Sequence, residues 1–236
     1  MNPPRTKTLV FLLPLILFSA FFLLKLTRPD FYASLIEEDS AIEYLQAVFY
    51  IAASVAALLV SIRLLRNGMT AAGILYALLA AGMLFASLEE ISWGQRIFRI
   101  PSPAYFERHN WQRELSIHNL NGVQKKLHGI YVLVGACGSF AWILALVVFR
   151  GAKAGIRRLI DFVVPEWFIS SYFFPTFLVY ATFEFVSRPG PGTFLVNRDQ
   201  EPAELLLSLG FLALAISKTI RLRQSGVVPA RSRAAS

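Results

Sequence analysis

The chain has 236 residues, of which 56% are hydrophobic and only 16% are charged, whereas a soluble domain usually carries about 25% charged residues. This composition argues against a soluble protein. The formal net charge of +8 lies largely in short segments between apolar runs, so we expect no nucleic-acid partner.

Six apolar runs approach or exceed the length that a helix needs to cross a bilayer, about 20 residues. They lie at about 8–26, 41–65, 70–88, 129–149, 167–187 and 203–220. Together they fill more than half of the chain and leave no room for a separate soluble domain. We therefore expect an all-α polytopic membrane protein, with one six-transmembrane-helix bundle over residues 1–223 and a disordered basic tail over 224–236.

The first run raises the question of a signal peptide, because Arg5 and Lys7 precede it. No clear small-x-small cleavage site follows it, and the chain continues into the charged segment 25–30. We expect a retained first helix.

The basic residues predict the orientation of the bundle. If the N-terminus is cytoplasmic, the inner segments hold 13 of the 23 basic residues and only two acids, Asp161 and Glu166, as the positive-inside rule requires. Both termini are then cytoplasmic, and we expect a bacterial inner membrane protein. The outer loop between the third and fourth spans, 89–128, is long enough to carry function.

Several acids near the outer ends of the spans have a structural explanation. Ser40 and Glu43 match a capping box at the start of the second span. Asp199, Glu201 and Glu204 flank Pro202 at the start of the sixth span, where acids suit the helix dipole. At this depth the same acids could also converge on one polar cavity.

Glu89 and Glu90 need another explanation, because they lie at the C-terminal end of the third span, where the helix dipole disfavours negative charge. If the helix continues to Phe98, Glu89 shares a face with Trp93 and Arg96. A Glu89–Arg96 ion pair is then the structural alternative. Otherwise, carboxylates at the edge of a bilayer core indicate a functional site.

The outer loop adds Glu114 and His118, which share a face if residues 110–120 form a helix. Joined by Glu89 or Glu90, they could hold a divalent metal ion. The same groups could also act without a metal, with one Glu as the general base and a second carboxyl group as its partner. A structural or binding network without chemistry is the third interpretation.

These alternatives define the candidate site. The expected catalytic residues are Glu89, Glu90, Glu114 and His118. If a divalent metal is the cofactor, its expected ligands are Glu90, Glu114 and His118. The expected substrate-binding residues are Arg96, Gln95, Asn110, Asn119 and Glu184.

Small residues mark two helix faces suited to close packing. One surrounds the single cysteine, Cys137, which we expect to pack between Gly135 and Gly138. The other, at Gly73, Ala77 and Ala81, could bind other membrane helices.

Two strings, 87–96 (SLEEISWGQR) and 110–119 (NxQxExxxHN), resemble those of uncharacterised bacterial multi-pass inner-membrane proteins. Glu89-Glu90 is also similar to the Glu-Glu-x-x-x-Arg string of CAAX-type membrane proteases, with Gly94 at the arginine position and Arg96 two residues later. Ala136-Cys137 loosely resembles the Ala-Cys pair of exosortase-like transpeptidases.

The expected function is that of a membrane enzyme, a hydrolase or transferase that acts at the outer face on a lipid-linked or envelope substrate. The alternatives are a proton- or cation-coupled transporter and a non-catalytic assembly partner. The partners expected are therefore the lipid bilayer and a lipid-linked substrate.

Overall fold

A computed structural model describes residues 3–186, 194–196 and 198–224. In these residues the protein is helical, and its sole β pairing is an isolated bridge between Asn110 and Leu120. The helices are α1 (Pro3–Thr27), α2 (Pro29–Ile36), α3 (Ala41–Arg66), α4 (Thr70–Glu90), a 3-10 turn (Ser92–Gly94), α5 (Gln95–Phe98), α6 (Ala104–His109), α7 (Gln124–Val148), α8 (Ala154–Val163), α9 (Ser170–Ala181), a π-helical turn (Thr182–Val186) and α10 (Glu201–Gln224). The expected tail lies almost wholly outside the described residues.

Among the described residues, five helices are long and apolar enough to cross a membrane: α1, α3, α4, α7 and α10. The sixth expected span, 167–187, is shorter and divided. Its helix begins only at Ser170, and α9 ends after 12 residues in the π-helical turn. The structure therefore confirms an all-helical protein with several membrane-compatible helices, and in its described part it does not confirm a sixth long helix.

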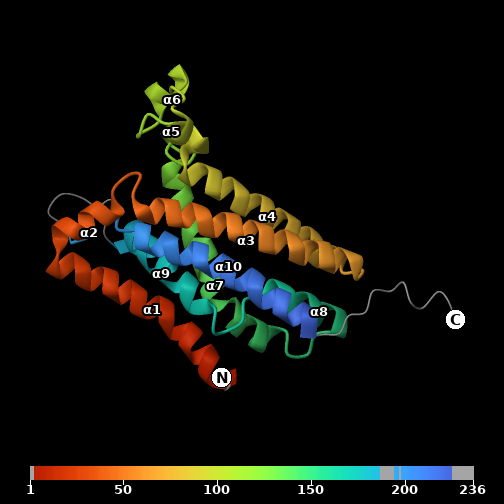
Figure 1. The fold of residues 1–236 in the computed structure, drawn as a ribbon. Helices are drawn as coiled ribbons and strands as arrows, with labels where there is room; N and C mark the ends of the chain where they lie inside the picture. Colours follow the sequence, from red (N-terminus) through yellow and green to blue (C-terminus); the bar gives the residue numbers. More distant parts are fainter. Residues whose placement is uncertain (1–2, 187–193, 197, 225–236) are drawn as a thin grey trace.

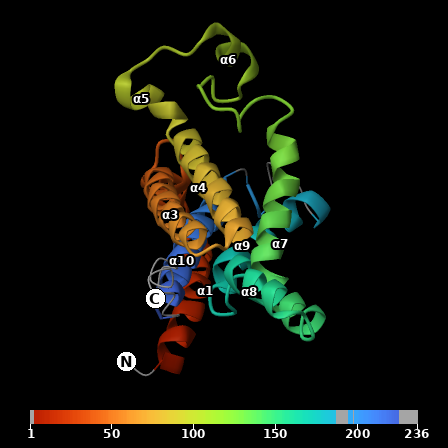
Figure 2. The same ribbon diagram turned by 90° about the vertical axis from the view of Figure 1, so that its right-hand side faces the viewer.

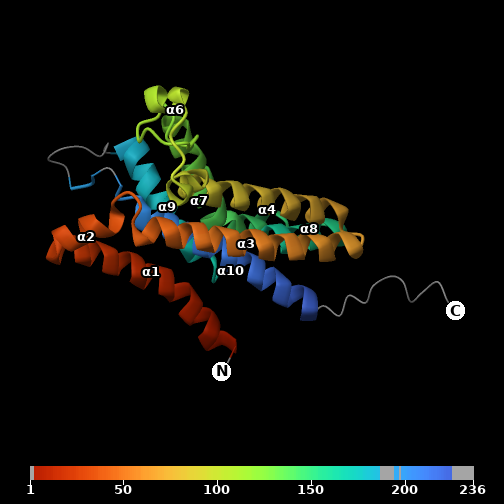
Figure 3. The same cartoon turned by 45° about the horizontal axis from the view of Figure 1, so that its top comes forward.

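The centre of the bundle is α10, whose first eight residues are all buried. It packs between α3 and α9, while α4 packs along the other side of α3 and α7 packs on α9 (Figures 1 and 3). A hydroxyl joins α9 to α10, because Thr176 Oγ1 donates a hydrogen bond to the carbonyl of Ala203 at 3.0 Å. The acids in the first turns of α10 consequently lie inside the protein.

The small-residue face of α7 is the contact with α9. A Cβ atom on Gly135 would lie 2.5 Å from the Phe177 backbone nitrogen, and one on Gly138 would lie 2.2 Å from the Phe173 ring. Only glycine allows this approach. Cys137 is exposed on the other side of the helix, so the expectation that it packs there is wrong.

The second small-residue face is used within the chain. Gly73 packs against Leu65 of α3, and Ser61 Oγ donates a hydrogen bond to the Gly73 carbonyl at 2.7 Å. Ala81 is exposed. The contact at Gly73 therefore stabilises the α3–α4 pair.

The end of α4 excludes the alternative in which this helix continues to Phe98. The helix ends at Glu90, and the next residues Ser92, Trp93 and Gly94 have φ values of 46°, 55° and 76°. Left-handed backbone at two non-glycine residues in succession is strained and turns the chain away from the helix axis. The segment 91–123 then rises above the bundle and returns to α7 (Figure 2).

Residues 110–120 do not meet the condition of forming a helix, because they make an irregular loop closed by the Asn110–Leu120 bridge. The helical face that was to unite Glu114 with His118 therefore does not exist. Other contacts bring these two residues to the same place.

The segment before α10 is held by Asp199, which is buried. Its carboxylate forms an ion pair with Lys25 of α1 and accepts hydrogen bonds from Tyr32 (2.9 Å) and the amide of Val196 (2.7 Å). Burial and the adjacent Asp199 carboxylate raise the pKa of the Tyr32 hydroxyl well above its usual range, so Tyr32 remains a hydrogen-bond donor. Asp199 thus joins α1 and α2 to α10, rather than capping α10 as expected.

At the other end of α10, Lys218 is fully buried. Its ammonium lies 3.0 Å from Glu166 Oε1 and donates to the carbonyls of Asp161 (3.0 Å) and Val164 (2.7 Å). A cation at the C-terminal end of α8 satisfies free helix carbonyls and suits the dipole. The contact fixes α8 against the bundle.

Candidate active site in a cavity beneath the 91–123 segment

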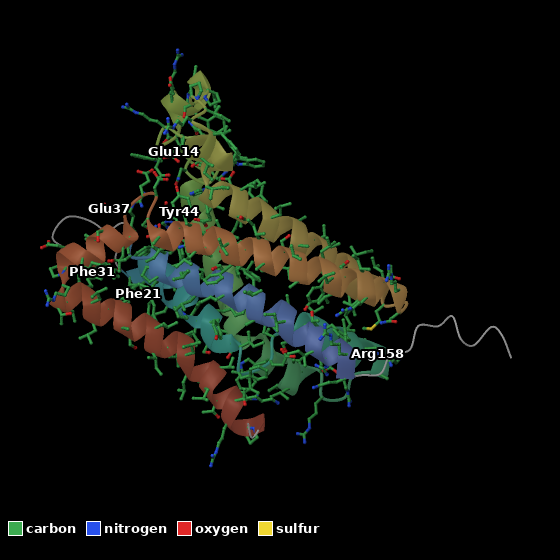
Figure 4. The ribbon with its side chains drawn as sticks, in the orientation of Figure 1. Phe21, Phe31, Glu37, Tyr44, Glu114 and Arg158 are labelled. Atoms are coloured by element: carbon green, nitrogen blue, oxygen red, sulfur yellow. The ribbon has the colours of Figure 1, made fainter. Side chains whose placement is uncertain are left out.

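A cavity of about 580 Å³ lies at the end of the bundle where α3 and α10 begin and α4 ends. We call this end the cavity end. Figure 4 shows Glu114 in the overlying segment, above the first turns of α3 near Tyr44, and Arg158 at the opposite end. The acidic side chains that line the cavity are Glu38, Asp39, Glu43, Glu89, Glu90, Glu114, Glu201 and Glu204, and its basic ones are Arg198, His118 and His128.

Glu89 attaches the overlying segment to α4. Its Oε2 accepts hydrogen bonds from the amides of Ile117 (2.6 Å) and His118 (2.8 Å) and lies 3.1 Å from His118 Nδ1. Its Oε1 accepts from Trp93 Nε1 at 2.6 Å. Both oxygens of Glu89 are therefore engaged in contacts with Trp93, Ile117 and His118.

Glu114 is buried in the same wall. Ser92 Oγ donates a hydrogen bond to its Oε2. Ser92 is one of the strained residues after α4, so the turn that ends the helix also orients Glu114. Glu114 and His118 therefore line one cavity through contacts with α4 and its turn, without a shared helical face.

Glu90 points into the cavity from the last turn of α4. Its carboxylate interacts electrostatically with those of Glu204, Glu201 and Glu43, which come from α10 and α3. No side chain among the described residues forms a hydrogen bond or ion pair with it. Glu90 is therefore the acid whose oxygens are most available to a ligand or a reacting water.

The α10 acids are held by neutral donors. Tyr180 OH donates a hydrogen bond to Glu204 Oε1, and Gln46 Nε2 donates to Glu201 Oε2 at 3.1 Å. Tyr180 stacks on Tyr131 with ring centroids 4.4 Å apart, and His128 lies edge-on to Tyr180 at 5.3 Å. The lining of the cavity is thus aromatic as well as acidic.

Arg198 is the one arginine among the described cavity residues. It forms ion pairs with Glu43 (3.2 Å) and Glu38 (3.7 Å) and donates to the Ile36 carbonyl at 3.1 Å. Glu43 Oε2 also accepts from the amide of Asp39 at 2.6 Å, whereas Ser40 forms no side-chain cap. The expected capping box is therefore incomplete, and Glu43 closes the turn before α3.

The expected substrate-binding residues separate into different places. Asn119 lines the cavity and donates to Gln112. Gln95 and Asn110 are buried and brace the overlying segment through Ser102, Leu115 and Ser116. Glu184 is exposed on the π-helical turn and does not line the cavity, and the side chain of Arg96 lies outside the described residues.

The structure does not assemble a metal site from these groups. Among the described residues, no three His, Cys, Asp or Glu side chains are arranged to hold a metal ion. Glu90, Glu114 and His118 face one cavity but do not converge as ligands.

No protein-family model, curated protein or solved structure matches this chain. The interpretation of the site therefore depends on its own geometry and chemistry.

Three cavity residues carried no clear signal in the sequence. Tyr131 and Tyr180 lie in apolar runs, where aromatic residues are ordinary, and His128 has no acidic or histidine neighbour close in the sequence that would mark it. Arg198 was not singled out, because its acidic partners are more than 150 residues away. The sequence feature that does indicate the cavity is the set of acids in the first turns of several spans. Two of them, Glu43 and Glu204, line the cavity.

Proposed function

We propose that the protein is an integral membrane enzyme that hydrolyses, or transfers a group from, a lipid-linked or envelope substrate at the cavity. One observation carries the proposal. Glu90 has no described hydrogen-bond partner, and it lies in a cavity that also holds an imidazole and a second buried carboxyl group. A base and a proton donor in one cavity are the requirement for general acid–base catalysis.

The roles follow from the contacts. Glu90 takes the proton of the attacking water or hydroxyl. His118, oriented by Glu89, is the candidate to protonate the leaving group. Glu89 is a positioning residue, and Glu114 acts through Ser92 and the overlying segment.

The positive-inside pattern supports the location. With both termini in the cytoplasm of a bacterium, the cavity end faces the outside of the inner membrane. Envelope lipids and lipid-linked precursors are then the substrates within reach.

The test is turnover by the purified protein in nanodiscs that contain bacterial polar lipids, followed by mass spectrometry of the lipids. Wild type should produce shortened or modified lipids, and Glu90→Gln should lower the rate by about 10²–10⁴-fold, the usual contribution of a general base. Glu37→Gln, an exposed acid at the end of α2 outside the cavity, is the matched control (Figure 4). Undiminished turnover by Glu90→Gln would exclude Glu90 as the base.

A second candidate is a proton- or cation-coupled transporter, because carboxyl groups from α3, α4 and α10 interact within the cavity. A pH-sensitive dye inside proteoliposomes distinguishes the two. Proton movement that needs Glu90, without lipid turnover, favours transport.

A further inference from the structure

The cavity has an apolar side that faces outward between two helices. Phe85 and Ala86 of α4 and Ile130 of α7 line it, yet Phe85 is 45% exposed and Ile130 is 53% exposed. Exposed apolar side chains on membrane-compatible helices face lipid. The same residues therefore contact both the cavity and the bilayer.

The helix packing leaves this side available. α4 packs mainly on α3, and α7 packs mainly on α9, rather than on each other. Figure 2 shows α4 and α7 standing apart, with the 91–123 segment connecting them at the top. Because Phe85, Ala86 and Ile130 line the cavity on this side, an acyl chain could enter it between α4 and α7.

The polar side of the cavity has a strong charge preference. Acidic residues far outnumber the basic ones there, and the one described arginine is already paired with Glu43 and Glu38. A phosphate or carboxylate head group would meet this excess of carboxyl groups. A cationic head group would be attracted to the carboxyl groups, and this charge complementarity would favour cationic over anionic ligands.

A buried acid of α10 is available for such a head group. Glu204 is only 8% exposed and lines the cavity. Among the described residues only Tyr180 bonds to it, and only at Oε1. Glu204 lines the cavity together with Glu90 and the stacked rings of Tyr131 and Tyr180, and aromatic faces attract ammonium groups.

From these observations we infer that the cavity binds a membrane amphiphile with an ammonium head group, whose tail leaves between α4 and α7 into the lipid. The head group lies between Glu90 and Glu204, next to the Tyr131–Tyr180 pair. This inference deepens the proposed function and rests on it for the role of the site, but binding requires no turnover. It names the substrate class as an amine-bearing lipid.

The experiment is photolabelling of the purified full chain in neutral maltoside micelles. The probe is hexadecylamine with a photoreactive diazirine in its tail, compared with the matched hexadecanol and hexadecyl phosphate. We expect the amine to label peptides around 85–90 and 127–131 at least about tenfold more strongly than either analogue, as expected for a desolvated charge contact. Stronger labelling by the phosphate, or equal labelling by all three probes, overturns the inference.

Variants test the two parts separately. Glu90→Gln and Glu204→Gln should each lower amine labelling at least about tenfold, while Glu37→Gln should not change it. Ala86→Trp, which fills the side between α4 and α7, should lower labelling by the long-chain probe. Unchanged labelling in Ala86→Trp overturns the lateral route. Each variant is first checked by size-exclusion profile and melting temperature, and Glu204→Gln alone decides if Glu90→Gln does not fold.

Competition and turnover complete the design. Unlabelled hexadecylamine should compete, whereas butylamine at equal concentration should not. Equal competition by butylamine would show that the cavity binds small free amines rather than an amphiphile, and it would overturn the inference. Amine labelling without any lipid turnover would contradict the proposed enzyme and leave the inference intact. Turnover restricted to anionic lipids would support the proposed enzyme and overturn the inference.

Discussion

Glu89 on the last turn of α4 accepts the amide hydrogen of His118 at 2.8 Å and lies 3.1 Å from its imidazole Nδ1. One carboxylate therefore fixes both the backbone and the ring of a residue 29 positions later in the chain. This contact holds the 91–123 segment over the cavity by attaching it to α4. It also distinguishes Glu89, which bonds to that segment, from its neighbour Glu90, which lines the cavity.

Glu89→Ala should release the 110–120 segment. The amides of Ile117 and His118 and the Trp93 indole would lose their acceptor, at a cost of about 1–3 kcal/mol. Hydrogen exchange should speed up at residues 114–120 while the amides within α3 stay protected. Unchanged hydrogen exchange at residues 114–120 would show that other contacts hold this segment in place.

Glu90→Gln should have the opposite effect on stability. Its carboxylate interacts with those of Glu201 and Glu204, and removing one charge relieves that repulsion. We expect an unchanged melting temperature or one raised by a few degrees, equivalent to about 1 kcal/mol, together with loss of turnover. A large drop in melting temperature would assign Glu90 a structural role.

Gly138→Ala should weaken the α7–α9 contact, because the new Cβ would lie 2.2 Å from the Phe173 ring. Such overpacking typically costs about 1–3 kcal/mol. Gly129→Ala is the matched control on the same helix, since nothing lies within 4 Å of its added Cβ. Thermal melting in detergent should show a lower midpoint for Gly138→Ala and an unchanged or higher one for Gly129→Ala.

Lys218→Met should destabilise the protein strongly, because Glu166 would lose its buried partner and the carbonyls at the end of α8 would lose their donor. Breaking a buried ion pair from one side costs about 3–5 kcal/mol. Adding Glu166→Gln should recover part of the loss, whereas Arg223→Met, at an exposed position one turn later, should be neutral. Equal effects of Lys218→Met and Arg223→Met would contradict a specific clamp.

Labelling can test whether α9 crosses the membrane. If it does, the number of crossings is even, and cysteines placed at Arg5 and Arg223 share one side of the membrane. In a Cys137→Ser background, an impermeant maleimide added to intact cells should then label neither position but should label Arg108→Cys in the 91–123 segment. Labelling at only one of Arg5→Cys and Arg223→Cys would mean that α9 does not cross.

The sequence by itself determined that the protein is helical and has several membrane-compatible helices, because apolar runs of bilayer length form helices for local reasons. It also indicated that Glu89 and Glu90 are unusual, since charge at that depth is costly wherever the helices pack. Both conclusions depend only on residues close together in the chain.

The tertiary structure decided which acids share the cavity and what each one contacts. The left-handed turn at Ser92 and Trp93, which periodicity does not predict, ends α4 and leaves Glu90 in the cavity while Glu89 bonds to the overlying segment. The buried start of α10 places Glu201 and Glu204 opposite Glu90, although more than 100 residues separate them in the chain. Such groupings arise from helix packing and long-range hydrogen bonds, so no local pattern in the sequence encodes them.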